Sequence, residues 1–142
     1  MKVDGGIAGS LRNAGTQAKE LEAAGYSGAW SFETAHDPFL PLLLAAEHTE
    51  TLQIGTSIAV AFARNPMTLA QIAWDMQAFS RGRFVLGLGS QIKPHITKRF
   101  SMEWSHPAAR MRETGLWDSA PFRSNDTGGN VVARDTKGQP LS

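Results

Sequence analysis

The chain has 142 residues, with 14 basic and 13 acidic side chains and a formal net charge of +1. This near balance argues against a nucleic-acid-binding protein, because a phosphate-binding surface normally needs a concentrated basic excess. Apolar residues make up 42% of the chain and charged residues 19%, which excludes a chain that is disordered throughout.

Four short apolar segments have the character of β-strands, and their starts lie about 25 to 30 residues apart. The predicted strands are Lys2–Asp4, Gly28–Phe32, Leu52–Val60 and Arg83–Leu88. The last two contain nearly continuous apolar runs, which is typical of parallel strands that are buried on both faces.

Helical patterns occupy the segments between and after these strands. The clearest begins at Pro66 behind the capping residue Asn65, carries an apolar stripe to Phe79 and stops at Gly82. In a second one, the carboxylate of Asp37 can cap a helix that starts at Pro38. The complete set of predicted helical segments is Asn13–Ala24, Asp37–His48, Pro66–Phe79, Pro94–Phe100 and Pro107–Glu113.

This alternation of strands and helices predicts βα units and a parallel sheet. Both the open doubly wound sheet and the closed eight-stranded barrel are built from such units, and periodicity does not separate them. A closed barrel needs eight units in about 250 residues. The chain has four units in residues 1–112.

The last 30 residues, 113–142, differ in composition from the body. Few of them are apolar, and no helical or strand period runs through more than a few of them. We expect a disordered or loosely attached tail. Two other readings are a single short strand at Val131–Ala133 and a tail translated from a different reading frame.

In both α/β architectures the functional residues follow the carboxyl ends of the strands. After the second predicted strand, Glu33, His36 and Asp37 bring two carboxylates and an imidazole into five residues, which could supply a general acid or base. The structural alternative is that Asp37 caps a helix, Glu33 pairs with a nearby cation and His36 is a surface residue.

Other motifs carry little signal. Gly87-Leu88-Gly89 lacks the third glycine of a dinucleotide-binding fingerprint and follows the fourth strand instead of the first. The remaining histidines are not at metal-ligand spacing, so we predict no metal site.

Three stretches together resemble the luciferase-like monooxygenase superfamily, and most closely its branch of deazaflavin (F420)-dependent oxidoreductases. They are residues 24–40, which contain Glu33-Thr34-Ala35-His36-Asp37, residues 54–66 and residues 80–91. Their order and spacing match the N-terminal half of such proteins, over about residues 1–112.

The resemblance implies a partial (β/α)8 TIM barrel of about four βα units, with the tail attached. It implies coenzyme F420, or alternatively FMN, bound at the carboxyl-end mouth, and hydride transfer or oxygen-dependent oxidation of a small organic substrate. It places a non-proline cis peptide at Ser57–Ile58, beneath the central ring of the coenzyme.

The same resemblance assigns roles to individual residues. Glu33, His36 and Asp37 are expected to form a catalytic polar wall. Many relatives carry a histidine after the acidic residue, where this chain has Thr34, and a hydroxyl cannot replace an imidazole as a base near pH 7. His36 then takes that role, or protonation works differently. Ser57 and Ile58 are expected to form the coenzyme platform, with Gly89, Ser90 and Gln91 as further coenzyme contacts.

Half of the expected barrel has no counterpart in the sequence, including the usual phosphate site after strands seven and eight. We therefore expect a truncated or frameshifted member of the family. The alternative is a catalytically inactive half-barrel that serves as an interaction module or is a degraded gene product. Unpaired sheet edges would favour homo-oligomers.

The sequence also suggests a cellular location. No apolar run reaches the roughly 18 residues of a membrane-spanning helix, and the first residues do not form a secretion signal. The absence of cysteine excludes disulfides and thiolate zinc sites. We expect a cytoplasmic protein without membrane or nucleic-acid partners.

Overall fold

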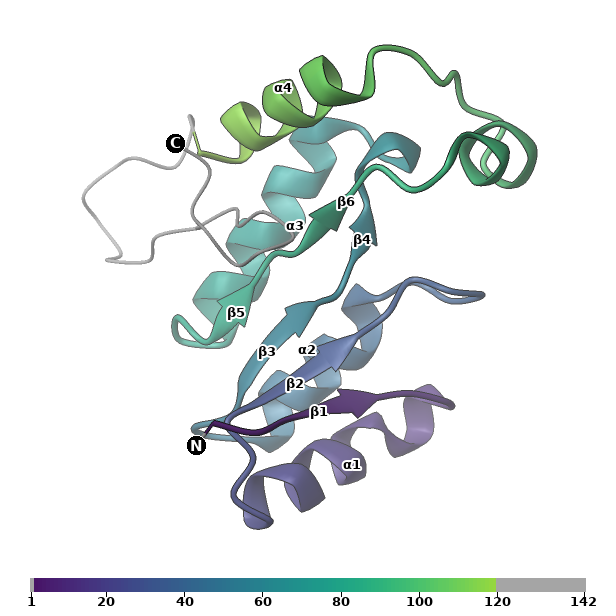
Figure 1. Cartoon of the computed structure of the whole chain (residues 1–142). Coiled ribbons are helices and arrows are strands. Elements are labelled where there is room, and N and C mark those ends of the chain that lie inside the picture. The colour runs from purple at the N-terminus through teal and green to yellow at the C-terminus, as the bar shows by residue number, and fades with distance from the viewer. Residues whose placement is uncertain (1, 120–142) are drawn as a thin grey trace.

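Strands and helices alternate along the chain in the computed structural model, which describes residues 2–119 (Figure 1). The strands are β1 (Asp4–Ile7), β2 (Gly28–Ser31), β3 (Gln53–Thr56), β4 (Ala59–Val60), β5 (Phe84–Val85) and β6 (Leu88–Gly89). The α-helices are α1 (Leu11–Ala23), α2 (Phe39–His48), α3 (Pro66–Phe79) and α4 (Pro107–Ser119). A 3-10 turn, η1 (Ala61–Ala63), and a π-helical turn, η2 (His95–Arg99), complete the set.

The sheet is parallel, as predicted. Four strands pair in the order β1-β2-β3-β5, and β4 pairs with β6 in a separate parallel ladder. Figure 1 shows that β4 continues the course of β3 and that β6 continues that of β5. The alternating parallel α/β architecture of the prediction is therefore confirmed.

The two longest predicted strands are each interrupted. The segment Leu52–Val60 forms β3 and β4, which are separated by Ser57 and Ile58, and Arg83–Leu88 forms β5 and β6. At the second interruption Thr56 Oγ1 donates to the Gly87 carbonyl (2.7 Å) and accepts from the Gly87 N–H (2.9 Å). A side chain thus satisfies backbone groups that a continuous ladder would otherwise pair.

The register separates a helix-covered face of the sheet from an opposite face. Gly5, Ala29, Ile54 and Phe84 are aligned across the four strands, and the last three are buried in the main hydrophobic core. The next row, on the other face, is Gly6, Trp30, Gly55 and Val85. Gly55 must be a glycine because a Cβ there would overlap the indole ring of Trp30.

The ends of α3 follow the predicted signals, whereas other boundaries shift: α2 begins at Phe39 and not at Asp37. Asn65 caps α3 by accepting from the Met67 N–H (2.9 Å), and Gly82 has a φ of 84° where the chain leaves that helix. However, α1 begins at Leu11 and not at Asn13, because Ser10 caps it. The strand β1 covers Asp4–Ile7 and not Lys2–Asp4, because Gly5 and Gly6 pair with β2.

At the amino ends of the strands, Arg83 and Glu22 tie several loops together. The guanidinium of Arg83 donates five hydrogen bonds of 2.8 to 3.0 Å; the acceptors are the carbonyl oxygens of Ala46, Thr49, Leu52 and Ser80 and the hydroxyl of Thr49. Glu22 accepts from the N–H groups of residues 50 to 52 and from the Thr51 hydroxyl.

The pKa values of Arg83 and Glu22 are both shifted from their ordinary values. Desolvation by burial lowers the pKa of Arg83. For Glu22, desolvation by burial acts to raise the pKa, but the hydrogen bonds from Thr51, Leu52 and Glu50 together outweigh it, so the pKa lies below its ordinary value.

The C-terminal helix extends further than predicted. The sequence predicts a helix that ends at Glu113, whereas α4 continues to Ser119. The prediction of a loose tail falls, from residue 120 onward, outside the described residues. None of the helices within residues 2–119 combines the length and apolar character that crossing a bilayer requires.

Candidate functional site

Two of the three predicted wall residues, Glu33 and Asp37, are joined by one cation, Arg64. The Nη1 of Arg64 lies 2.6 Å from Glu33 Oε2, and its Nη2 lies 3.0 Å from Asp37 Oδ2. Glu33 Oε2 also accepts from the Val60 N–H (2.5 Å), and Asp37 Oδ1 accepts from the Phe39 N–H (2.8 Å). Both carboxylates therefore have structural partners.

Burial differs between these two carboxylates. The Glu33 side chain is 6% exposed and that of Arg64 is 15% exposed, whereas the Asp37 side chain is 42% exposed. The Glu33–Arg64 contact is thus a mostly buried, charge-assisted hydrogen bond, and Asp37 lies at its solvent side. This geometry matches the structural alternative for Glu33 and Asp37: one pairs with a cation and the other caps α2.

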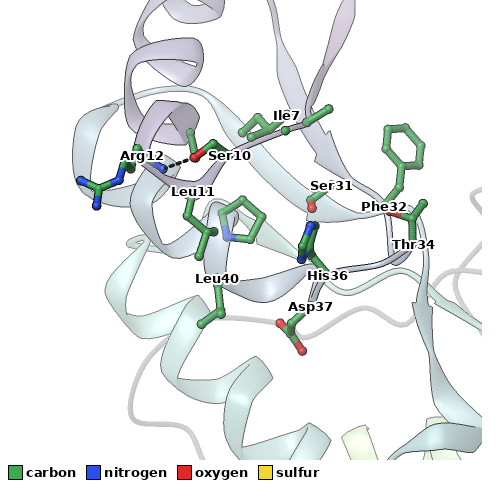
Figure 2. A pocket seen from close by; sticks show the side chains of 14 residues that line it. Ile7, Ser10, Leu11, Arg12, Ser31, Phe32, Thr34, His36, Asp37 and Leu40 are labelled. Carbon is green, nitrogen blue, oxygen red and sulfur yellow. Dashed lines mark hydrogen bonds between the residues drawn. The ribbon is translucent and has the colours of Figure 1, made fainter. Parts of the chain in front are cut away.

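His36, the third wall residue, faces a pocket. The pocket has a volume of about 760 Å³ and lies where β1 and β2 end and α1 and α2 begin (Figure 2). His36, Asp37, Thr34, Ser31, Ser10 and Arg12 provide polar groups to its lining. No hydrogen-bond partner of the His36 imidazole is found within residues 2–119, which leaves the ring available to a ligand.

Apolar side chains form much of the rest of this lining. Leu11, Phe32 and Leu40 are between 43% and 52% exposed, and all three line the pocket. Large apolar side chains that gather at one concave site while remaining exposed are typical of ligand-binding surfaces. The pocket therefore combines apolar walls with an unpaired imidazole.

The residues predicted to form the coenzyme platform lie at the neighbouring strand ends. The peptide bond between Ser57 and Ile58 is cis, as the resemblance implies. The Ser57 N–H donates to the Ser31 carbonyl (2.8 Å), so this segment lies directly beside the end of β2. Val60 pairs with Gly89, and a Cβ on Gly89 would lie 2.6 Å from Ile58 Cδ1. The Ile58 side chain therefore packs directly against Gly89.

The segment after β6 contains the remaining predicted contacts. Ser90 Oγ donates to the Gln91 carbonyl (3.3 Å), and the Gln91 side chain is hydrogen-bonded to His95 Nδ1 (3.1 Å). Gln91 has a φ of 58°, which turns the chain away from the strand direction. A second apolar cluster below this segment contains Val60, Phe62 and Ile96.

The predicted residues therefore form two adjoining groups. Ile58 packs against Gly89 where β4 begins and β6 ends, with Ser57 next to it in the chain. His36 and Asp37 line the pocket on the other side of β2. Glu33 belongs to neither surface: its N–H donates to the Ile58 carbonyl (3.4 Å), and its carboxylate is turned to Val60 and Arg64.

No role is predicted from the sequence for Arg64, although it joins the two carboxylates. Its position just before the cap of α3 suggests only a loop residue. The available signal is electrostatic, because a buried Glu33 needs a cation and Arg64 is the basic residue that follows the neighbouring strand. Within residues 2–119, no group of three or more His, Asp or Glu side chains is arranged to hold a metal ion.

Comparison with known proteins identifies the family. The model of the luciferase-like monooxygenase family matches residues 2–120. The chain belongs to this family. Its curated relatives include an uncharacterized protein, Rv1360, of Mycobacterium tuberculosis, which is 61% identical over 113 residues that cover 80% of this chain and 33% of the relative. F420-dependent glucose-6-phosphate dehydrogenase 1 of Rhodococcus jostii is 33% identical over 110 residues, which cover 68% of this chain and 33% of that protein.

Solved structures of luciferase-like proteins confirm the fold. Monooxygenase RslO1 from Streptomyces bottropensis matches with a TM-score of 0.78 at 20% identity, over 96% of this chain and 46% of that one. The oxygenating constituent of 3,6-diketocamphane monooxygenase from Pseudomonas putida, solved in complex with FMN, matches with a TM-score of 0.72 at 16% identity, over 100% of this chain and 48% of that one.

The extent of these matches agrees with a partial barrel. The chain spans about a third of the length of the curated relatives and under half of the two solved structures. The named relatives of this luciferase-like chain include one that depends on F420 and one that is bound to FMN.

Proposed function

We propose that this chain provides the coenzyme platform and one substrate wall of an oxidoreductase that transfers hydride between coenzyme F420 and a small organic substrate. The observation that carries the proposal is the adjacency of two surfaces: Ile58 packs directly against Gly89, and a pocket with apolar walls and an imidazole lies on the other side of β2. FMN is the alternative coenzyme.

The residues present fit a flat aromatic ring system. Gly89 offers no side chain, so Ile58 presents a half-buried aliphatic surface with Ser57 exposed beside it. Ser90 and Gln91 add polar groups along the adjoining segment. Such a surface, apolar in the middle and polar at its border, suits a ring with an apolar face and hydrogen-bonding edges.

When bound, F420 or FMN supplies the hydride chemistry, and the chain's own residues hold and protonate the substrate. Leu11, Phe32 and Leu40 would exclude water from an apolar substrate in the pocket. The imidazole of His36 would give or take the proton at the substrate oxygen, because imidazole exchanges protons near neutral pH. Thr34 and Ser31 would orient that oxygen by hydrogen bonding.

The proposal is tested by titrating the chain with oxidised coenzyme F420 and, separately, with FMN, and following coenzyme fluorescence. We expect saturable binding that Gly89→Ala weakens about tenfold, because the new methyl group would displace Ile58. The matched control is Ile92→Ala, which removes an exposed isoleucine close to the same loop and should leave binding unchanged.

Two outcomes would contradict the proposal. The first is that neither coenzyme binds at concentrations near 100 μM, a threshold of about 5 kcal/mol. The second is that Gly89→Ala and Ile92→Ala weaken binding equally, because the platform would then have no special part.

We also propose self-association through the sheet edges. Within the described residues, β1 and β5 are the outer strands of the four-stranded sheet, and their outer backbone groups have no ladder partner. Such edges favour pairing with another chain. Size-exclusion chromatography with light scattering should give a mass above one chain, and a monomer at all concentrations would refute this proposal.

A further inference from the structure

Arg64 contacts both ends of the short segment that carries His36. Its Nη1 lies 2.6 Å from Glu33 and its Nη2 lies 3.0 Å from Asp37. Between these two anchors are only three residues, Thr34, Ala35 and His36. One planar guanidinium thus fastens both ends of a three-residue segment.

The same guanidinium is itself held from the other side. Arg64 Nη1 also donates to the Val60 carbonyl (3.2 Å), and the guanidinium carbon lies 5.4 Å from the centre of the Phe39 ring. Val60 donates its own N–H to Glu33 and belongs to β4, the strand that begins just after Ile58. The contacts of Val60 with Arg64 and Glu33 therefore connect the His36 segment to β4, the strand next to the proposed platform.

The free side chains of this segment point at the pocket. Thr34 and His36 both line it, whereas the carboxylates of Glu33 and Asp37 have their partners in Arg64, Val60 and Phe39. The charged side chains of Glu33 and Asp37 hold the segment, and the imidazole of His36 and the hydroxyl of Thr34 remain available to a ligand. Figure 2 shows His36 and Asp37 at this wall of the pocket.

We propose that Arg64 is a positioning residue for His36: by bridging Glu33 and Asp37 it holds the imidazole at the pocket wall at a fixed place relative to the platform. This inference rests on the proposed function, in which His36 handles the substrate proton. A lysine cannot take over, because its single ammonium group lacks the planar fork that reaches two carboxylates at once.

Two single variants break the bridge in different ways. Arg64→Lys keeps the positive charge beside the buried Glu33 but cannot reach both carboxylates. Asp37→Asn removes the ion pair with Arg64 and keeps a side-chain oxygen that can still cap α2 at the Phe39 N–H. The matched control is Arg81→Lys, in the exposed Arg81–Glu50 pair (3.4 Å), which lies away from the pocket.

The first measurement needs no coenzyme. We expect amide hydrogen exchange of residues 34 to 36 to accelerate about tenfold in Arg64→Lys and in Asp37→Asn, but not in the control. The ring signals of His36, assigned with His36→Gln in ¹H–¹³C spectra, should shift in the two variants, while those of His48 and His95 stay in place.

Combining the two changes provides the decisive comparison. If the two variants break the same bridge, the double variant should alter the amide exchange rates and the His36 ring signals no more than either single variant does. Effects that add, or a His36 signal that does not move in Arg64→Lys, would overturn the proposal. If Arg64→Lys does not fold, Asp37→Asn and its control still give the result.

The second measurement separates positioning from support of the platform. The dissociation constants of oxidised F420 and of FMN should stay within about twofold of the unmodified chain in both variants. A loss above tenfold would overturn the assignment to His36, because Arg64 would then act through the platform. If the unmodified chain binds neither coenzyme, the proposed function fails, while the exchange and ring signals still decide the role of Arg64.

Discussion

Replacing Arg83 by methionine should destabilise the chain strongly, because five hydrogen bonds depend on one guanidinium. The change leaves the carbonyl oxygens of Ala46, Thr49, Leu52 and Ser80 and the Thr49 hydroxyl without this donor. At about 1 kcal/mol net for each bond, the sum is about 5 kcal/mol. Because the side chain is half-buried, water can reach some of these acceptors, and we expect a loss of about 3 kcal/mol.

Urea unfolding at pH 7, followed by circular dichroism, measures this loss. The free energy of unfolding of Arg83→Lys should fall between those of the unmodified chain and Arg83→Met, since an ammonium group has three donors and cannot satisfy five acceptors. Arg81→Met, which removes an exposed arginine two positions away, should change the free energy of unfolding by less than about 0.5 kcal/mol. A loss below about 1 kcal/mol for Arg83→Met would refute the reasoning, because the carbonyl groups would then not depend on the guanidinium.

Three further predictions concern other parts of the framework. Because the pKa of Glu22 is lowered in the folded chain, its ionised form stabilises the fold above the ordinary glutamate pKa of about 4.3, and this contribution is lost as the pH falls through the folded value. Glu22→Gln should therefore be less stable than the unmodified chain at pH 7. In urea titrations between pH 7 and pH 4, the variant should also lose less stability than the unmodified chain. Gly87→Ala should cost more than about 2 kcal/mol, because the new Cβ would overlap the Thr56 carbonyl oxygen, and wild-type stability in urea unfolding would refute this. Asn65→Ala should cost about 1 kcal/mol by removing the cap of α3, whereas Asn65→Asp should restore most of it in thermal unfolding.

Most of the fold was predictable because its signals are local. The cap at Asn65, the proline at the start of α3 and the apolar stripe behind it define that helix without tertiary information. The boundaries of β1 were not predictable in the same way. Gly5 and Gly6 have no strand propensity of their own, and they are extended because they pair with β2.

The interruption of the longer strands also depends on tertiary contacts. An apolar run such as residues 83–88 reads as one strand, but the exchange of hydrogen bonds between Thr56 and Gly87 takes over the backbone pairing in its middle. A contact over 31 positions leaves no periodic signal in the sequence.

For the candidate site, the sequence points to the segments of interest but not to how their charged groups are arranged. The family resemblance leads to residues 33–37, to Ser57 and Ile58 and to residues 89–91. Residue types alone cannot say which carboxylate is buried. The structure gives Glu33 and Asp37 a shared partner, Arg64, so that the two carboxylates hold the loop while His36 and Thr34 line the pocket.

The hydrogen bonds made by Arg83 and Glu22 lie at the opposite end of the strands from the pocket. Loop exchange experiments can use this separation: libraries that randomise residues 8–10, 34–35 and 90–92 alter the chemistry of the rim and leave both anchoring groups untouched. The chain thereby offers a scaffold in which ligand preference can be diversified independently of the groups that hold its base together.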